Sequence, residues 1–143
     1  MNRLGEIVEA IISQLRGIDG GGEYNYSFSG EQVISGYISH EQATRYPCVC
    51  VIGAGFDGTE FIDQKSRSMP FNVELLGYVR SEQAVLGEAF KLASDIETAV
   101  FSDETLGGLA WDLSVRLEVS AMNTGSYGGV FLEIKGMTMK DRP

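Results

Sequence analysis

The stretch Ser81–Ser120, SEQAVLGEAFKLASDIETAVFSDETLGGLAWDLSVRLEVS, predicts a helix, a tight turn and a strand in immediate succession. Apolar residues recur in its first half at steps of three and four, the period of an amphipathic helix: Val85, Leu86, Ala89, Phe90, Ala93, Ile96 and Val100. Ser81 is placed to cap this helix, which we expect over about residues 82–101. Ser-Asp-Glu-Thr and then Gly107-Gly108 favour a turn after Phe101.

The second half of the stretch alternates strictly between apolar and polar residues, which predicts a half-buried strand. The side expected to face the core holds Trp111, Leu113, Val115, Leu117 and Val119. We expect the preceding helix to cover this strand and Trp111 to fill the core beneath that helix. The alternative is that Trp111 lies at a subunit interface, where tryptophan is over-represented.

The rest of the chain predicts one more helix and several strands. Asn2 to Arg16 has a continuous apolar stripe, with Asn2 as its cap and Gly17 at its end, so this helix should dock on the sheet. Strands are expected within Tyr24–Ser39 (two short strands or one bent at Ser29-Gly30), and over Cys48–Ile52, Phe71–Val79 and Val130–Met139. Cys48–Ile52 is apolar on both faces, as in a strand covered on both sides.

Consecutive strands joined by turns indicate antiparallel pairing. The prediction is therefore a single α+β domain over residues 1–143: a mostly antiparallel sheet flanked by two amphipathic helices, about 2–16 and 82–101. Gly53–Pro70 is the least structured stretch, and a long β-arm loop is expected around residues 55–68, with Thr59–Asp63 as a possible hairpin arm. Loops of that length are often functional.

Composition excludes several functions. The 143 residues are 43% hydrophobic and 22% charged, which is typical of a globular domain. No apolar run approaches the roughly 20 residues that cross a bilayer, and the N-terminus lacks a cleavage site for a signal peptide. A net charge of −9 argues against a nucleic-acid-binding surface. Acidic walls do suit a channel through which DNA passes without binding.

The most conspicuous motif is Gly53-Ala54-Gly55-Phe56-Asp57-Gly58, which matches G-x-G-x-x-G directly after an apolar strand, with Glu74 at a plausible distance for a ribose contact. Dinucleotide binding by this motif requires a helix after the glycines, and Thr59–Pro70 has no apolar stripe. We therefore interpret it as a glycine-rich turn. A module that binds a small ligand at this turn stays the more remote alternative.

Metal binding and catalysis have little support in the sequence. Cys48, Cys50 and His40 supply three candidate zinc ligands where a structural site needs four, so we expect the cysteines to be small buried hydrophobes. Their spacing in one strand puts them on the same side and makes a disulfide between them unfavourable. We expect His40 to be a solvated loop residue, and no nucleophile elbow is present. We predict no enzyme and no cofactor.

The order of elements resembles that of the tail terminator proteins of long-tailed bacteriophages, and of related tail-completion and neck proteins. The likeness is carried by Arg45-Tyr46-Pro47-Cys48-Val49-Cys50-Val51, by the helix Ala89–Val100, and by Ser102-Asp103-Glu104-Thr105-Leu106-Gly107-Gly108 with the strand after it. It covers nearly the whole chain as a pattern of elements and includes no catalytic residues.

The resemblance implies a structural role in the virion, in the region between tail and neck, after assembly in the host cytoplasm. Such proteins form a hexameric ring that caps the tail tube, stops its polymerisation and joins the head-side connector, while DNA passes through the lumen. Tube protein, connector and possibly sheath protein are the implied partners, without a membrane. A neighbouring neck, connector or minor tail protein of the same fold is the alternative. Gly55–Ser68 is the best candidate for reaching these partners, and the turns Ser102–Gly108 and Asn123–Gly128 are lesser candidates. The candidate interface residues are Gly55, Phe56, Asp57, Phe61, Lys65, Arg67, Asp103 and Glu104.

Overall fold

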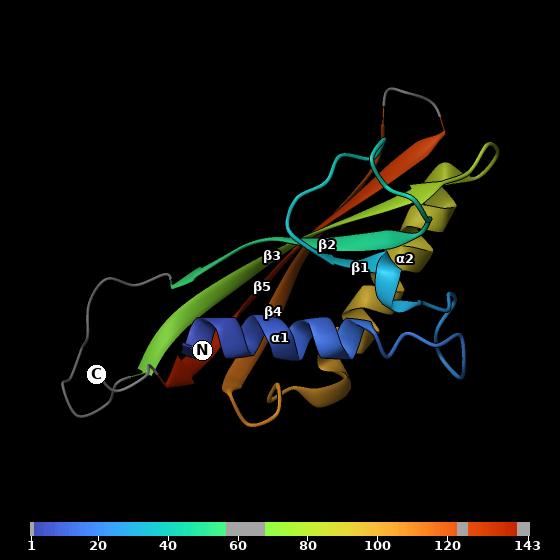
Figure 1. Ribbon diagram of the computed structural model, residues 1–143. Coiled ribbons are helices and arrows are strands. Elements are labelled where there is room, and N and C mark those ends of the chain that lie inside the picture. Colours follow the sequence, from blue (N-terminus) through green and yellow to red (C-terminus); the bar gives the residue numbers. More distant parts are fainter. Residues whose placement is uncertain (1, 57–67, 123–125, 140–143) are drawn as a thin grey trace.

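The computed structural model describes residues 2–56, 68–122 and 126–139. Within these ranges two α-helices pack on one face of a five-stranded sheet (Figure 1). The predicted α+β class is confirmed. The helices are α1 (Arg3–Leu15) and α2 (Val85–Val100), and the strands are β1 (Val33–Ser35), β2 (Cys48–Phe56), β3 (Ser68–Arg80), β4 (Ala110–Ala121) and β5 (Tyr127–Met139).

The strand order across the sheet is β1-β2-β3-β5-β4. β2, β3, β5 and β4 pair antiparallel, and only β1 runs parallel to its neighbour, β2. The predicted final hairpin is therefore confirmed as β4 and β5. The two edges differ greatly in length, because β1 has 3 residues and β4 has 12.

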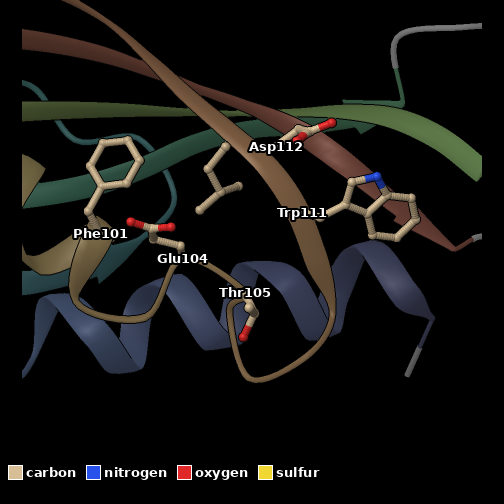
Figure 2. A pocket seen from close by; sticks show the side chains of 6 residues that line it. Phe101, Glu104, Thr105, Trp111 and Asp112 are labelled. Carbon is tan, nitrogen blue, oxygen red and sulfur yellow. The ribbon is translucent and has the colours of Figure 1, made fainter.

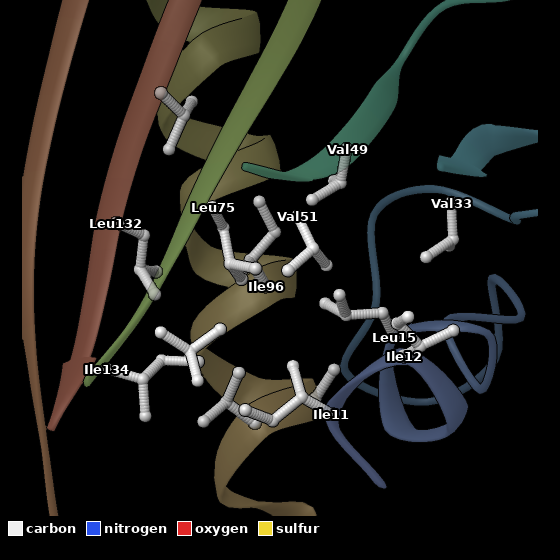
Figure 3. Packing of buried hydrophobic residues seen from close by; sticks show 14 of the residues in the cluster. Ile11, Ile12, Leu15, Val33, Val49, Val51, Leu75, Ile96, Leu132 and Ile134 are labelled. Atoms are coloured by element: carbon white, nitrogen blue, oxygen red, sulfur yellow. The ribbon is translucent and has the colours of Figure 1, made fainter. Parts of the chain in front are cut away.

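Helix α1 forms as its sequence predicts. The Asn2 side chain accepts a hydrogen bond from the Gly5 amide at 2.8 Å and so caps the helix. The apolar stripe is buried against β2 and α2, and Gln14 Nε2 donates to the carbonyl oxygens of Ala99 and Val100 at the end of α2. Figure 3 shows α1 contributing Ile11, Ile12 and Leu15 to the same cluster as Ile96 of α2 and Leu75 of β3.

The first half of strand β2, Cys48–Val51, is buried on both faces, as predicted. Val49 and Val51 face the helices. Cys48 and Cys50 face the opposite side, where they pack with Tyr78 and with Ile38 and Tyr46 from the connection between β1 and β2. That connection, and no helix, covers this part of the second face.

Helix α2 buries Ala89, Ala93, Ile96 and Val100 as predicted, but the buried stripe is rotated away from Leu86 and Phe90. Leu86 and Phe90 are 45% and 57% exposed, and the buried positions include Leu92, Asp95 and Ala99. The helix lies close to the sheet because Gly77 leaves room for Leu92: a Cβ there would lie 2.9 Å from Leu92 Cδ2. Ser81 accepts a hydrogen bond from the Ala84 amide at 3.1 Å, but it lies before the cap position, since the helix begins at Val85.

The prediction of a strand at Tyr24–Phe28 is wrong. The backbone amides of Asn25 and Tyr26 donate to the carboxylate of Asp95, at 2.9 and 2.8 Å respectively, and a single isolated bridge, Asp19 to Ser27, is the only β pairing described there. The segment alternates like a strand, yet it lies on α2, because a buried carboxylate must be hydrogen-bonded and these amides supply its donors. In this region only β1 is a strand.

The stretch predicted as a loop from Gly53 is shorter than expected. β2 continues to Phe56 and β3 begins at Ser68, because Gly53–Phe56 pair with Phe71–Glu74 across the two strands. Thr59–Asp63 and the central part of the predicted β-arm lie outside the described residues. In the predicted turn before β5, residues 123–125 also lie outside them, and Tyr127 and Gly128 belong to β5.

Candidate interaction surfaces

The predicted interface residues that the structure describes fall into two groups. Gly55 and Phe56 end β2, opposite Asn72 and Phe71, while Asp103 and Glu104 lie in the turn between α2 and β4. Both groups lie at the same end of the sheet, but three strand spacings, about 14 Å, separate β2 from β4. Asp57, Phe61, Lys65 and Arg67 lie outside the described residues.

The turn between α2 and β4 is held by Asp103. One of its carboxylate oxygens accepts hydrogen bonds from the amide and hydroxyl of Thr105, at 3.0 and 2.7 Å, and the other accepts from the Gly107 amide at 2.9 Å. These hydrogen bonds lower the pKa of Asp103 below its ordinary value of 3.8, and the bonds from Thr105 have the largest effect. Leu106, at φ 49°, is fully buried and anchors the turn to the core.

Trp111 does not lie in the core beneath α2, as the alternation predicted. It is 38% exposed. Between Trp111 and Ser114 the pairing with β5 gains one residue, since the partners are Met137 and Lys135, and Asp112 has a φ of 56°. This β-bulge reverses the alternation, so Trp111 points to the opposite face from Leu113. In Figure 2 Trp111 projects from β4 away from Phe101.

A hollow of about 370 Å³ lies between this turn and the start of β4 (Figure 2). We call it the Trp111 hollow; its lining is Phe101, Glu104, Thr105, Trp111, Asp112 and Leu113. Figure 2 shows the side chains of Trp111 and Asp112 on the other side of β4 from Phe101 and Glu104, so the two aromatic rings do not face one another across the hollow. Of these residues Glu104 was a predicted interface residue and Trp111 an alternative one, whereas the bulge at Asp112 has no signature in the apolar pattern.

An apolar strip lies along the β4 side of α2. Leu86 and Phe90 are one helical turn apart, on the side of α2 opposite Asp95 and its bonds to Asn25 and Tyr26. α2 packs next to β4, where Leu117, paired with Leu132, lies on the helix-covered face and is 37% exposed. We call Leu86 and Phe90 the apolar strip. It borders β4, an edge strand whose outer backbone groups are unpaired within the described sheet. Unpaired groups of this kind can pair with a strand of another chain.

The face of the sheet away from the helices is polar over β4 and β5. Glu133 Oε1 lies 3.7 Å from Arg116 Nε and 4.0 Å from Lys135 Nζ, and the Arg116 guanidinium lies 5.5 Å from the centroid of Phe131. A shallow groove of about 460 Å³ lies beside these side chains, and its lining includes Leu76, Met122 and Phe131. Arg116 and Lys135 are more than half exposed, and ion pairs with such exposed partners contribute little stability.

The glycine motif does not form a phosphate-binding turn in the described part. Gly53 and Gly55 are residues of β2, paired with Glu74 and Asn72 of β3, and their amides therefore lie in a sheet and not at the start of a helix. The interpretation of Gly53–Gly58 as a turn is wrong for residues 53–56, and residues 57 and 58 lie outside the described ranges. A small-ligand site at this glycine-rich turn was the more remote alternative. Residues 53–56 do not provide the free backbone amides of a turn or helix start that such a site would use.

The cysteines are buried side by side on one face of β2, as predicted. Cys48 and Cys50 are 1% and 0% exposed, both are free thiols, and burial raises the pKa of Cys48 to about 12. His40 differs from the expected solvated residue, because its ring packs edge-on against Tyr127 with 4.7 Å between centroids. In the described ranges no three His, Cys, Asp or Glu side chains are grouped to hold a metal ion.

No protein-family model matches the chain, and a search of curated proteins finds no match to it. In the parts of the chain that the structure describes, no helix has the length and apolar character needed to span a bilayer. The case for a function therefore depends on the order of the elements and on the surfaces described above.

Proposed function

We propose that this protein is a structural protein of a long-tailed bacteriophage, a tail terminator that caps the tail tube as a ring. In that role it stops tube polymerisation and joins the tube to the head-side connector. Support comes from the likeness in element order: an N-terminal helix, the Tyr46-Pro47 entry into a buried strand, α2, the Asp103 turn and the final hairpin.

The observation that carries the proposal is the apolar strip beside the edge strand β4. Leu86 and Phe90 were predicted to be core residues, yet they are largely exposed. Large exposed apolar side chains next to an unpaired edge are a liability for a monomer and are typical of a protein-protein interface. In a ring, each copy would place this strip against a different surface of the next copy, a heterologous contact that closes after a fixed number of subunits.

The test is the mass of the purified protein by light scattering, alone and after mixing with the tail tube protein of its own phage. We expect a particle of six times the 15.6 kDa chain, either alone or bound to tubes whose length it limits. A protein that stays monomeric and leaves tube length unchanged would contradict the proposal.

A matched pair of variants tests the surface. Phe90→Glu places a charge in the apolar strip and should abolish the ring without unfolding the chain, because Phe90 is 57% exposed. Ser13→Glu adds the same charge on the exposed face of α1 and should leave the ring intact. If both variants assembled equally well, the apolar strip would not be part of the ring interface.

A further inference from the structure

A shallow apolar groove lies on the face of the sheet away from the helices. We call it the Phe131 groove: Leu76, Met122 and Phe131 supply its apolar side chains, and Gly129 leaves room between them. A Cβ at Gly129 would lie 3.4 Å from Met122 Cε and would meet nothing closer. Leu76 pairs with Phe131, and neither belongs to the cluster beneath the helices, so the groove opens on the face opposite α2.

We propose that the Phe131 groove receives the apolar strip of a second copy of this chain, a contact that rests on the proposed ring. A ring joins each copy to the next through two different surfaces. The apolar strip is one of them, and an apolar groove on another face is a complementary surface for the side chains of Leu86 and Phe90. Each sheet would then lie between its own α2 and the α2 of a neighbour.

The directions of the two surfaces fit a ring of six. Leu92 and Ile96 of α2 point at the sheet, because a Cβ on Gly77 would lie 2.9 and 3.5 Å from their side chains. By the period of an α-helix, the apolar strip points about 120° around α2 from these two residues. The groove opens in the direction in which Leu92 and Ile96 point, on the far side of the sheet. In a ring of six, the two contacts of one subunit likewise face about 120° apart.

The two surfaces also lie at the same level along α2. A Cβ on Gly128 would lie 3.2 Å from Val85 Cγ2, so the first turn of α2 lies over the start of β5. Leu86 follows Val85 in the strip, and Gly129 follows Gly128 in the groove. A contact without displacement along the axis closes into a ring, whereas a displaced one gives an open helical filament.

α2 runs in the direction of β5. Its first turn lies over the first residues of β5, and the later Leu92 lies over Gly77, the partner of Val130. The ring axis in this arrangement is parallel to α2, so the α2 of the next copy keeps the same direction over the groove. The second copy therefore binds in one orientation, with the residues after Phe90 lying toward the end of β5.

Opposite charges meet in that orientation. Glu97 lies in line with the apolar strip, about 16 Å beyond its first residue, and its carboxylate has no partner among the described residues. Lys135 lies about 20 Å beyond Gly129 along β5, and its side chain is 54% exposed. Because Glu133 lies between Arg116 and Lys135, a further carboxylate there meets two cations. An ion pair from Glu97 to Lys135 would fix the register of the contact.

Two variants that each keep one surface test this contact without requiring a ring. Gly129→Val fills the groove at a strand position that suits valine, whereas Phe90→Glu blocks the apolar strip. Each variant alone should be monomeric. Their equimolar mixture should form a dimer of twice the 15.6 kDa chain and nothing larger, because only one strip and one groove remain. Phe131→Glu is a second groove variant and should act like Gly129→Val.

Sedimentation velocity measures the dimer at chain concentrations up to about 0.5 mM, because a single contact binds more weakly than a closed ring does. Lys135→Glu in the Phe90→Glu chain should weaken the dimer about tenfold, through like-charge contact with Glu97. Adding Glu97→Lys to the Gly129→Val chain should restore the affinity to within about threefold. Arg16→Glu, at an exposed position after α1, changes the net charge equally and should leave the dimer unchanged.

Three results would overturn the proposal. A mixture that stays monomeric while the wild type forms a ring would place the ring contact elsewhere and leave the proposed function intact. A dimer of Gly129→Val alone or of Phe90→Glu alone would show that like surfaces pair. Equal weakening by Arg16→Glu and Lys135→Glu would reduce the charge effect to overall repulsion. A dimer in the mixture from a wild type that forms no ring would support this contact and contradict the proposed function.

Discussion

At the scale of single residues, a glycine in the sheet makes room for large side chains of the neighbouring strands. Gly136 of β5 lies opposite Phe71, and a Cβ at this position would lie 2.9 Å from two ring atoms of Phe71 and 2.7 Å from Leu113 Cδ2. Phe71 is fully buried and has no space to move into. The sequence marks Gly136 only as a glycine within a strand pattern.

Gly136→Ala should therefore lower the free energy of unfolding by about 1–3 kcal/mol, the usual cost of overpacking. Gly87→Ala is the matched control, because Gly87 is an exposed residue of α2 whose Cβ would meet nothing within 4 Å. It should raise the free energy of unfolding by up to about 1 kcal/mol through helix propensity. Urea denaturation of both variants measures this, and a loss of stability in both would contradict the account of Gly136.

At the scale of elements, Asp95 joins the segment before β1 to α2. Its carboxylate is fully buried in mid-helix and accepts from the amides of Asn25 and Tyr26 and from Asn25 Nδ2. Asp95→Ala leaves these donors without their acceptor and should cost about 3 kcal/mol. Ser94→Ala, at the neighbouring exposed position, should be nearly neutral. Thermal unfolding compares the two, and similar midpoints would show that the segment is held in another way.

The Asp103 turn makes a pH-dependent contribution to stability. The folded-state pKa of Asp103 is lowered from 3.8, so its contribution is present above pH 3.8 and is lost as the pH falls further through the lowered value. Asp103→Asn should be less stable than the wild type at pH 7, and the difference should shrink below pH 3.8. Urea denaturation between pH 7 and pH 2.5 measures it, with Glu31→Gln as the control for net charge. A difference that does not change with pH would contradict the hydrogen-bonding role.

At the scale of the whole molecule, the two edges of the sheet differ in length and in what covers them. β1 is short and continues into the connection that covers Cys48 and Cys50, whereas β4 has 12 residues whose outer edge no described strand pairs. A long unpaired edge with apolar neighbours is kept in natural proteins where it meets a partner. The apolar strip on α2, which carries the proposed function, lies next to this edge.

If the ring forms through this edge, backbone amides of β4 that point away from β5 should exchange with deuterium quickly in the free chain and slowly after assembly on tubes. Peptides covering residues 110–121 report this by mass spectrometry. Peptides covering β3, which is paired on both sides, serve as the internal control and should exchange slowly in both states. Protection confined to the β1 edge would assign the ring contact to the opposite side of the sheet.

The sequence by itself determined the period of each long element, and hence the two helices, the long strands and the α+β class. These depend on local repetition, as in the Asn2 cap of α1 or the alternating residues of β3. It located the turn at Asp103 and Glu104 for the same reason. It could not separate Tyr24–Phe28 from a strand, because the bonds that hold this segment come from Asp95, some 70 residues away.

Only the tertiary structure decided which apolar residues are covered. Leu86 and Phe90 fit the helical period as well as Leu92 does, but a stripe has no direction until the sheet lies beside it, and Gly77 of the sheet makes room for Leu92 and Ile96. Trp111 fits the strand period as well as Leu113 does, but the bulge at Asp112 reverses it. The exposure of Leu86, Phe90 and Trp111 arises in this way, because the direction of a side chain depends on register and packing, which a one-dimensional pattern does not contain.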